Sequence, residues 1–196
     1  MNDIVIEVKN ATVRFNKSAE SISGLKEYII KMLKRELMFQ EFLALKNINF
    51  TVKRGESWGL IGKNGSGKST LLKLISGIIR PYQGNVTVNG SISPLIELGA
   101  GFDPELTARE NIFLNGALLG YSKIFIESHF QEIVDFAELN DFIDVPIKNF
   151  SSGMSARLGF AIATVQKPDI LIVDEVLAVG DFSFQQKCKE RMENLL

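Results

Sequence analysis

The chain has 196 residues, of which 45% are hydrophobic and 23% are charged, and its formal net charge at pH 7 is −1. This balance is typical of a globular protein with a buried core, and the near-zero net charge argues against nucleic acid as a partner. The single cysteine, Cys188, excludes an internal disulfide and a CxxC zinc site, while segment 1–8 does not resemble a signal peptide and no run approaches the ~20 apolar residues of a membrane span.

The first quarter of the chain alternates between strand and helix patterns. Residues 4–15 mix β-branched residues with turn formers and predict a strand, and small polar residues over 18–24 predict a loop. Apolar residues recur at helical spacing over 25–39, with lysines and an arginine between them, which predicts an amphipathic helix. The alternation of apolar and polar residues over 45–52 predicts a second strand.

Residues 62–70 read G-K-N-G-S-G-K-S-T and match the phosphate-binding P-loop, G-x-x-x-x-G-K-[ST]. The apolar run 57–61 predicts a buried strand before the loop, and 71–75 predicts a helix after it, which is the setting that a P-loop requires. A Gly/Ser-rich turn that matches by chance is the alternative, and both flanks argue against it.

Each residue type of this loop has a role in holding a nucleoside triphosphate. Glycines let backbone N–H groups approach phosphate oxygens, Lys68 places a cation on the β- and γ-phosphates, and Ser69 offers a hydroxyl to Mg²⁺. The helix N-terminus adds partial positive charge. The predicted nucleotide-binding residues here are Gly62, Lys63, Asn64, Gly65, Ser66, Gly67, Lys68, Ser69 and Thr70.

The remaining elements follow in order. We predict strands at 85–88, 91–96 and 170–173, a Gly-rich bend at 98–101, mostly helical structure over 107–142, and helices at 149–165 and 184–196. The fully apolar run 170–173 suits a central parallel strand, and it ends in Asp174 and Glu175. Beside a P-loop, Asp174 can hold Mg²⁺ and Glu175 can act as general base for an attacking water. The alternative is an ordinary strand with a charged end.

Residues 150–154 and Arg157 resemble the L-S-G-G-Q-x-x-R signature of ATP-binding cassette (ABC) ATPases. Ser151, Gly153 and Arg157 match that signature, whereas Phe150, Ser152 and Met154 depart from it. By itself the segment also fits a plain serine-capped helix. The resemblance implies that Ser151, Ser152, Gly153 and Met154 bind the ATP that a second subunit's P-loop holds. Asp181 matches the acid of the family's D-loop.

Segments 97–102, 105–111 and 176–181 are similar to the ABC exporters of lipid-linked polysaccharides and teichoic acids. The resemblance implies an ATPase that uses Mg-ATP, pairs head to tail with a second copy and couples to membrane permease subunits. It further implies a peripheral position at the cytoplasmic face of the membrane. The cargo would be an O-antigen, capsule or teichoic-acid polymer.

Several positions depart from the family pattern or stay open. No glutamine lies between Gly84 and Gln131, so Glu97 is the candidate substitute as a Mg²⁺ ligand, with a solvated strand-end acid as the alternative. Phe15 is the candidate for stacking on adenine, unless it packs inward. The helix predicted over 25–39 either contacts the permease or headgroup region or packs on its own domain, and the second is favoured. The one histidine, His129, precedes the signature and is predicted to be a surface helix residue rather than the family's switch histidine.

Together these features predict an α/β fold: a P-loop NTPase of ABC type with a mixed-sheet core, a small antiparallel β subdomain and a helical subdomain over about 104–165. We expect 1–196 to be a single nucleotide-binding domain that is C-terminally truncated before the switch histidine. The alternatives are an ABC exporter ATPase for another cargo, a soluble non-transport ABC ATPase, and a subunit that binds ATP without hydrolysing it.

Overall fold

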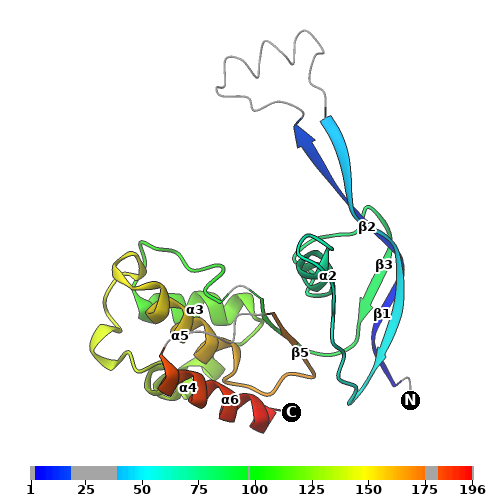
Figure 1. The fold of residues 1–196 in the computed structure, drawn as a ribbon. Coiled ribbons are helices and arrows are strands. Elements are labelled where there is room, and N and C mark those ends of the chain that lie inside the picture. The colour runs from blue at the N-terminus through cyan, green and yellow to red at the C-terminus, as the bar shows by residue number, and fades with distance from the viewer. Residues whose placement is uncertain (1–2, 19–38, 97, 175–180, 196) are drawn as a thin grey trace, which may run out of the picture. The chain divides into compact units, whose positions relative to one another are not determined.

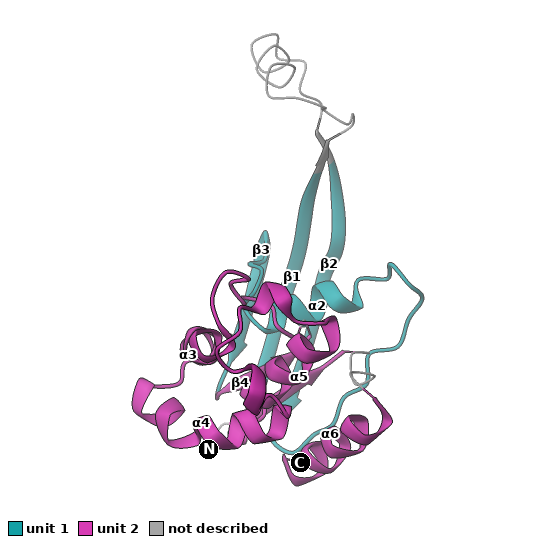
Figure 2. Ribbon diagram, turned by 90° about the vertical axis from the view of Figure 1, so that its left-hand side faces the viewer, with its two compact units in different colours: residues 1–89 teal, residues 90–196 magenta. Residues whose placement is uncertain are grey.

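The computed structural model describes residues 3–18, 39–96, 98–174 and 181–195, which form two compact units (Figures 1 and 2). Unit 1 spans residues 1–89 and unit 2 spans residues 90–196. Two predicted site residues, Glu97 and Glu175, lie outside the described residues. The same holds for residues 25–38 of the helix predicted over 25–39.

The described part of unit 1 is a three-stranded antiparallel sheet with the helix α2. Its elements are β1 (Ile4–Ser18), β2 (Phe39–Lys53), α2 (Lys68–Ile75) and β3 (Gln83–Val88). The strand order is β2-β1-β3, so β1 is central, and Ile6 lies opposite both Val52 and Val88. The buried residues of β1 form the core of this unit together with Leu74 and Ile75 of α2.

The far ends of β1 and β2 continue as a two-stranded ribbon (Figure 1). β3 pairs with β1 only as far as Thr12, whereas β1 and β2 stay paired to Ser18 opposite Phe39. A register shift falls between Val13, which lies opposite Leu45, and Arg14, which lies opposite Leu43. Ala44 is therefore an extra residue in β2, a β-bulge.

Unit 2 combines a parallel strand pair with helices. Its elements are β4 (Ile92–Leu95), α3 (Ala108–Leu118), α4 (Lys123–Ala137), η1 (Asn140–Phe142), η2 (Ile147–Asn149), α5 (Ser152–Ala163), β5 (Ile170–Val173) and α6 (Phe182–Leu195). β4 and β5 run parallel, with Ile92 opposite Ile170 at one end and Leu95 opposite Val173 at the other. The Ser93 hydroxyl ties this pair to α5 by donating to the Ala163 carbonyl at 2.6 Å.

Two apolar clusters form among the described residues of unit 2. The larger one packs α3, α4 and α5 around fully buried Ile112 and Leu158. The smaller one joins β4, α5 and α6 through Leu95, Phe160 and Phe184, and it also buries Cys188 at 2% exposure. Burial raises the pKa of the Cys188 thiol to about 11. This thiol is therefore neutral and shielded rather than a reactive nucleophile.

Most predicted strands and helices are confirmed, but the strand predicted over 57–61 is wrong. Residues 56–63 form no regular element, Trp58 is 56% exposed and Ile61 is 100% exposed. A strand needs a neighbouring strand for its backbone hydrogen bonds, and this run pairs with none of the three described strands of unit 1. Instead the Trp58 indole donates to the Glu56 carboxylate at 3.0 Å.

His129 lies in α4 and is half-buried, and its ring stacks on Phe125 with the ring centroids 4.2 Å apart.

Among the described residues, no helix combines the length and the apolar character that crossing a bilayer requires.

Candidate nucleotide-binding site

The P-loop, residues 62–70, lies in unit 1, and its last residues, from Lys68 on, form the start of α2. Gly65 and Gly67 have φ values of +81° and +96°, which favour glycine over residues with a Cβ. A Cβ on Gly67 would also lie 2.9 Å from both the Ala44 carbonyl oxygen and a methyl group of Leu45. The loop is therefore packed against β2 at its bulge, and glycine is required there for two separate reasons.

The start of α2 has the features of an anion site. Its N-cap residue is Gly67, and no described side chain caps this helix end with a hydrogen bond. The first helical hydrogen bond runs from Leu71 N to the Gly67 carbonyl at 2.9 Å. A helix N-terminus carries partial positive charge and N–H donors, which suit a phosphate group.

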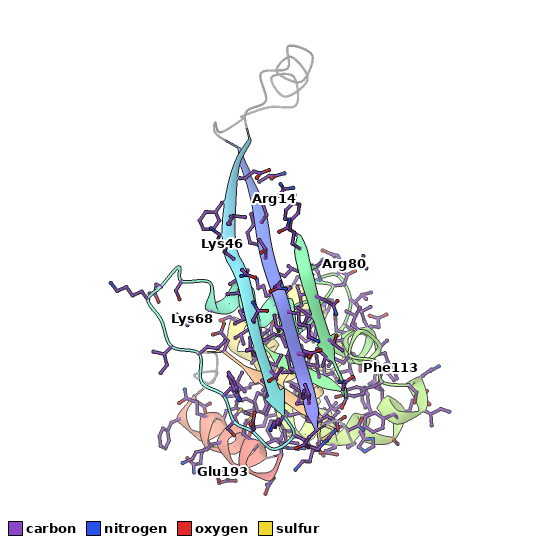
Figure 3. The ribbon with its side chains drawn as sticks, turned by 90° about the vertical axis from the view of Figure 1, so that its right-hand side faces the viewer. Arg14, Lys46, Lys68, Arg80, Phe113 and Glu193 are labelled. Atoms are coloured by element: carbon purple, nitrogen blue, oxygen red, sulfur yellow. The ribbon has the colours of Figure 1, made fainter. Side chains whose placement is uncertain are left out.

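The Lys68 side chain folds back over the loop. Its ammonium donates to the carbonyl oxygens of Gly62 at 2.9 Å and of Lys63 at 3.4 Å. The loop is further closed by a hydrogen bond from Ser66 N to the Lys63 carbonyl at 3.1 Å. Figure 3 labels Lys68 beside this loop. The cation is thus held over the loop whose backbone would receive the phosphates.

Phe15 lies on the β1–β2 ribbon, directly opposite Phe42. The two rings are 44% and 55% exposed, so Phe15 is not part of the core of unit 1. Phe15 shares a strand face with Val13, whose partner Leu45 contacts Gly67 of the P-loop. Two exposed rings therefore share the face of the sheet that meets the P-loop. Sequence analysis missed Phe42 because the pairing depends on the bulge at Ala44.

The signature segment forms the start of α5 in unit 2. Ser151 is the N-cap, and its hydroxyl accepts a hydrogen bond from Met154 N at 3.2 Å. A cavity of about 400 Å³ opens at this helix end. It is lined by Glu138, Leu139, Phe142, Ser151, Gly153, Met154, Arg157 and Asp181. Four of the predicted nucleotide-binding residues, Ser151, Gly153, Met154 and Asp181, thus line one cavity.

Arg157 links two acidic residues at the wall of this cavity. Its guanidinium donates to Glu138 at 2.8 Å and to Asp181 at 2.6 Å, and it lies over the buried Phe184 ring at 4.9 Å. Lys187 donates to the other oxygen of Glu138, also at 2.8 Å. We name Glu138, Arg157, Asp181 and Lys187 the ion-pair network.

Hydrogen bonds keep both acids of the network ionised. The bond from Lys187 lowers the pKa of Glu138, and the charges of Lys187 and Arg157 act in the same direction. The bond from Phe184 N lowers the pKa of Asp181, with Arg157 adding to the effect. Sequence analysis missed Glu138 and Lys187, because nothing in the chain order shows that these distant residues meet.

The segment 105–111, predicted from the exporter resemblance, proves to be a helix start with a structural clamp. Thr107 and Glu110 form a capping box at α3. Asn111 is fully buried, and its amide donates to the carbonyls of Asp103, Leu106 and Thr107 while accepting from Asp103 N. This part of the motif therefore fixes the loop before α3.

Asp174 follows β5 directly and is half-buried. Its carboxylate and, separately, the hydroxyl of Ser69 at the P-loop are hard oxygen donors, the type that Mg²⁺ prefers, so the chemistry of each side chain fits that metal. Ser69 lies in unit 1 and Asp174 in unit 2. The other predicted ligand, Glu97, and the predicted base, Glu175, lie outside the part of the chain that is described.

Comparison with known proteins gives a consistent result. Residues 45–178 match the family described as ABC transporter. The chain is 47% identical to the O-antigen export system ATP-binding protein RfbB of Klebsiella pneumoniae, over 94% of this chain and 76% of that protein. It is 42% identical to the teichoic acids export ATP-binding protein TagH of Listeria monocytogenes, over 91% of this chain and 51% of that protein. A relative in Myxococcus xanthus, also described as RfbB, is 43% identical over 98% of this chain and 44% of its own length.

The fold agrees with solved structures. A dimeric ATP-binding cassette in a post-hydrolysis state with ADP and Pi superposes with a TM-score of 0.71, over 97% of this chain and 82% of that one. At 23% sequence identity this likeness concerns the fold alone. It confirms the predicted class, an α/β P-loop fold of the cassette type.

Proposed function

Because the chain belongs to the ABC transporter family, we propose that it is the ATP-hydrolysing subunit of an exporter for a lipid-linked cell-surface polysaccharide or teichoic acid. The observation that carries the ATPase part is the P-loop: glycines at positive φ, a helix that starts at Lys68, and an ammonium folded over the loop. The cargo class rests on the names of relatives that are 42–49% identical to this chain.

The phosphates of ATP would bind to the P-loop. Its backbone N–H groups donate to phosphate oxygens, and Lys68 exchanges its present carbonyl partners, Gly62 and Lys63, for the β- and γ-phosphates. This exchange of partners is favourable, because the ammonium binds an anionic phosphate oxygen more strongly than a neutral carbonyl oxygen. Phe15 stacks on the base.

Ser69 and Asp174 are the residues that would hold Mg²⁺, with Glu97 as a further candidate. When bound, this ion neutralises charge on the phosphate oxygens. Glu175 orients a water and accepts its proton, which is the general-base step of the proposal. Lys68 is the second proposed catalytic residue, and it stabilises the charge that develops on the γ-phosphoryl group during its transfer to water.

The cavity at the start of α5 would receive the γ-phosphate of an ATP bound to a second copy of the chain. Ser151 and Gly153 present a hydroxyl and a small-residue helix start there. Two copies arranged head to tail would then form two composite sites related by a two-fold axis. Opening and closing of this pair would act on the permease at the cytoplasmic face of the membrane.

Phosphate release by the full chain tests the ATPase proposal. Lys68→Ala should abolish ATP binding, and Glu175→Gln should bind ATP but hydrolyse it very slowly. Lys123→Ala, at the exposed start of α4, is the control of the same residue type and should behave as the wild type. Wild-type turnover in the Glu175→Gln chain would refute the base assignment.

Co-purification tests the transport proposal. The chain should isolate with a polytopic membrane protein when expressed together with the neighbouring genes, and disruption should leave lipid-linked polymer inside the cell. Accumulation of some other cargo would reject the polysaccharide assignment but keep the ATPase.

A further inference from the structure

The ion-pair network joins three helices at one wall of the cavity at the start of α5. Glu138 ends α4, Arg157 lies in α5, and Asp181 precedes α6. Arg157 is the central member, because it contacts both acids, and its side chain is 19% exposed. Its guanidinium lies over the Phe184 ring, which is 1% exposed. The guanidinium is therefore held on three sides.

Glu138 has an unusual backbone for its residue type. It is the C-cap of α4 in the left-handed conformation, with φ at +59°. Glycine or asparagine is the ordinary choice at such a helix end, because a Cβ is disfavoured there. A glutamate at this position gives up backbone stability. What the side chain provides in return is a carboxylate that accepts from Arg157 and from Lys187.

Asp181 accepts two hydrogen bonds that link the ion-pair network to the start of α6. One carboxylate oxygen accepts from Phe184 N at 2.9 Å and so caps α6, while the other accepts from Arg157 at 2.6 Å. The position of this helix start therefore depends on where Arg157 lies. Arg157 has a second carboxylate, Glu138, that prevents it from swinging toward Asp181 alone.

The charges of the network cancel. Two carboxylates face two cations, so the network is neutral as a whole, and each of the two acids that line the cavity pairs with a cation. Lys187 is not itself one of the lining residues. Paired acids suit a cavity that receives an anionic phosphate, because an unpaired acid would repel it. Glu138 and Asp181 both line the cavity together with Ser151 and Gly153.

From these contacts we propose that Glu138 is a positioning residue for ATP hydrolysis. It fixes the Arg157 guanidinium between two acids, and through Arg157 it sets the position of Asp181 against the start of α5. The inference rests on the proposed function and deepens it: the chain's own P-loop binds ATP, and the network aligns the cavity that completes the neighbouring copy's site.

Glu138→Gly and Glu138→Gln separate positioning from folding. Glycine relieves the left-handed backbone and glutamine keeps the side-chain shape, yet both remove the charge that holds Arg157. We expect kcat for ATP hydrolysis by the full chain to fall about tenfold in both, because small misplacements are costly in catalysis. KM for ATP should stay within about twofold, since the chain's own P-loop is untouched. The thermal midpoint of Glu138→Gly should match or exceed that of the wild type.

Glu193→Gln is the matched control. Glu193 is an exposed glutamate of α6 that pairs with Lys189 at 3.9 Å and lies outside the ion-pair network, so kcat should stay within about twofold of the wild type. The inference is overturned if Glu138→Gly keeps wild-type kcat, or if Glu193→Gln loses as much kcat as Glu138→Gln. It is also overturned if kcat falls only in step with the thermal midpoint. A wild-type chain that binds no ATP would instead overturn the proposed function, which keeps the two failures distinct.

Discussion

The glycines around the P-loop allow a graded test of how tightly the loop is built. Gly59 has an ordinary φ, and a Cβ added there would meet no described atom within 4 Å, whereas Gly65 has the same open space but a φ of +81°. Gly67 has both a φ of +96° and two atoms of β2 at 2.9 Å. Alanine therefore adds no strain at position 59 and backbone strain alone at position 65. At position 67 it adds both backbone strain and a steric clash with β2.

The expected magnitudes follow from these contacts. Left-handed backbone costs a residue with a Cβ about 1–2 kcal/mol, and overpacking adds about 1–3 kcal/mol. Gly65→Ala should therefore lose about 1–2 kcal/mol of unfolding free energy and Gly67→Ala about 2–5 kcal/mol, while Gly59→Ala should lose almost none. Because the clash falls on the loop whose backbone N–H groups would hold the phosphates, Gly67→Ala should also bind ATP at least about tenfold more weakly, which corresponds to about 1.4 kcal/mol of binding free energy.

Urea unfolding of the three variants, with ATP titration by calorimetry, gives both quantities. The decisive comparison is between Gly65→Ala and Gly67→Ala, because they share the positive φ and differ in the contact with Ala44 and Leu45. Equal losses at these two positions would refute the packing of the loop on β2. A large loss in Gly59→Ala would refute the exposed arrangement of segment 57–61.

Three further outcomes are expected. Asn111→Ala removes one accepted hydrogen bond and two N–H donors that three carbonyls share, and it should cost about 3 kcal/mol of unfolding free energy in urea. Asn115→Ala removes the amide's bond to the Ala100 carbonyl and should cost about 1 kcal/mol, so equal costs would contradict the role of Asn111 in fixing the loop before α3. Phe15→Ala should weaken ATP binding about 5- to 100-fold through lost stacking, and Leu43→Ala, equally exposed but paired with Arg14, should not; the same loss in both would reject the base contact. Because the pKa of Glu138 is lowered in the folded state, its contribution to stability is present above the unfolded value near 4.5 and is lost as pH falls through the lowered folded value. The stability gap between wild type and Glu138→Gln should therefore close below about pH 4.5, and a gap that widens in acid would contradict this.

Local signals carried most of the fold. The helix after the P-loop was predictable because Gly67, Lys68 and the apolar spacing of 71–75 all act within one turn or two. The parallel strand at 170–173 was predictable because a short, fully apolar run next to a proline-broken helix has few other uses. Ser151 as an N-cap belongs to the same class of local signal.

Features that depend on distant contacts were not predictable. Segment 57–61 has the composition of a strand, but composition does not reveal whether a partner strand is present. Glu138 occupies a left-handed helix end that favours glycine, so its sequence context hides its role. Only the meeting of α4, α5 and α6 shows why that residue is a glutamate.

Trp58 is the only tryptophan in the chain and follows Glu56 just before the P-loop. Its indole is 56% exposed and lies 5.7 Å from the Phe50 ring. Excitation at the red edge of protein absorbance therefore yields fluorescence from Trp58 alone. The chain thus carries a built-in optical reporter for the segment leading into the P-loop, and stopped-flow experiments can follow that segment without an attached dye.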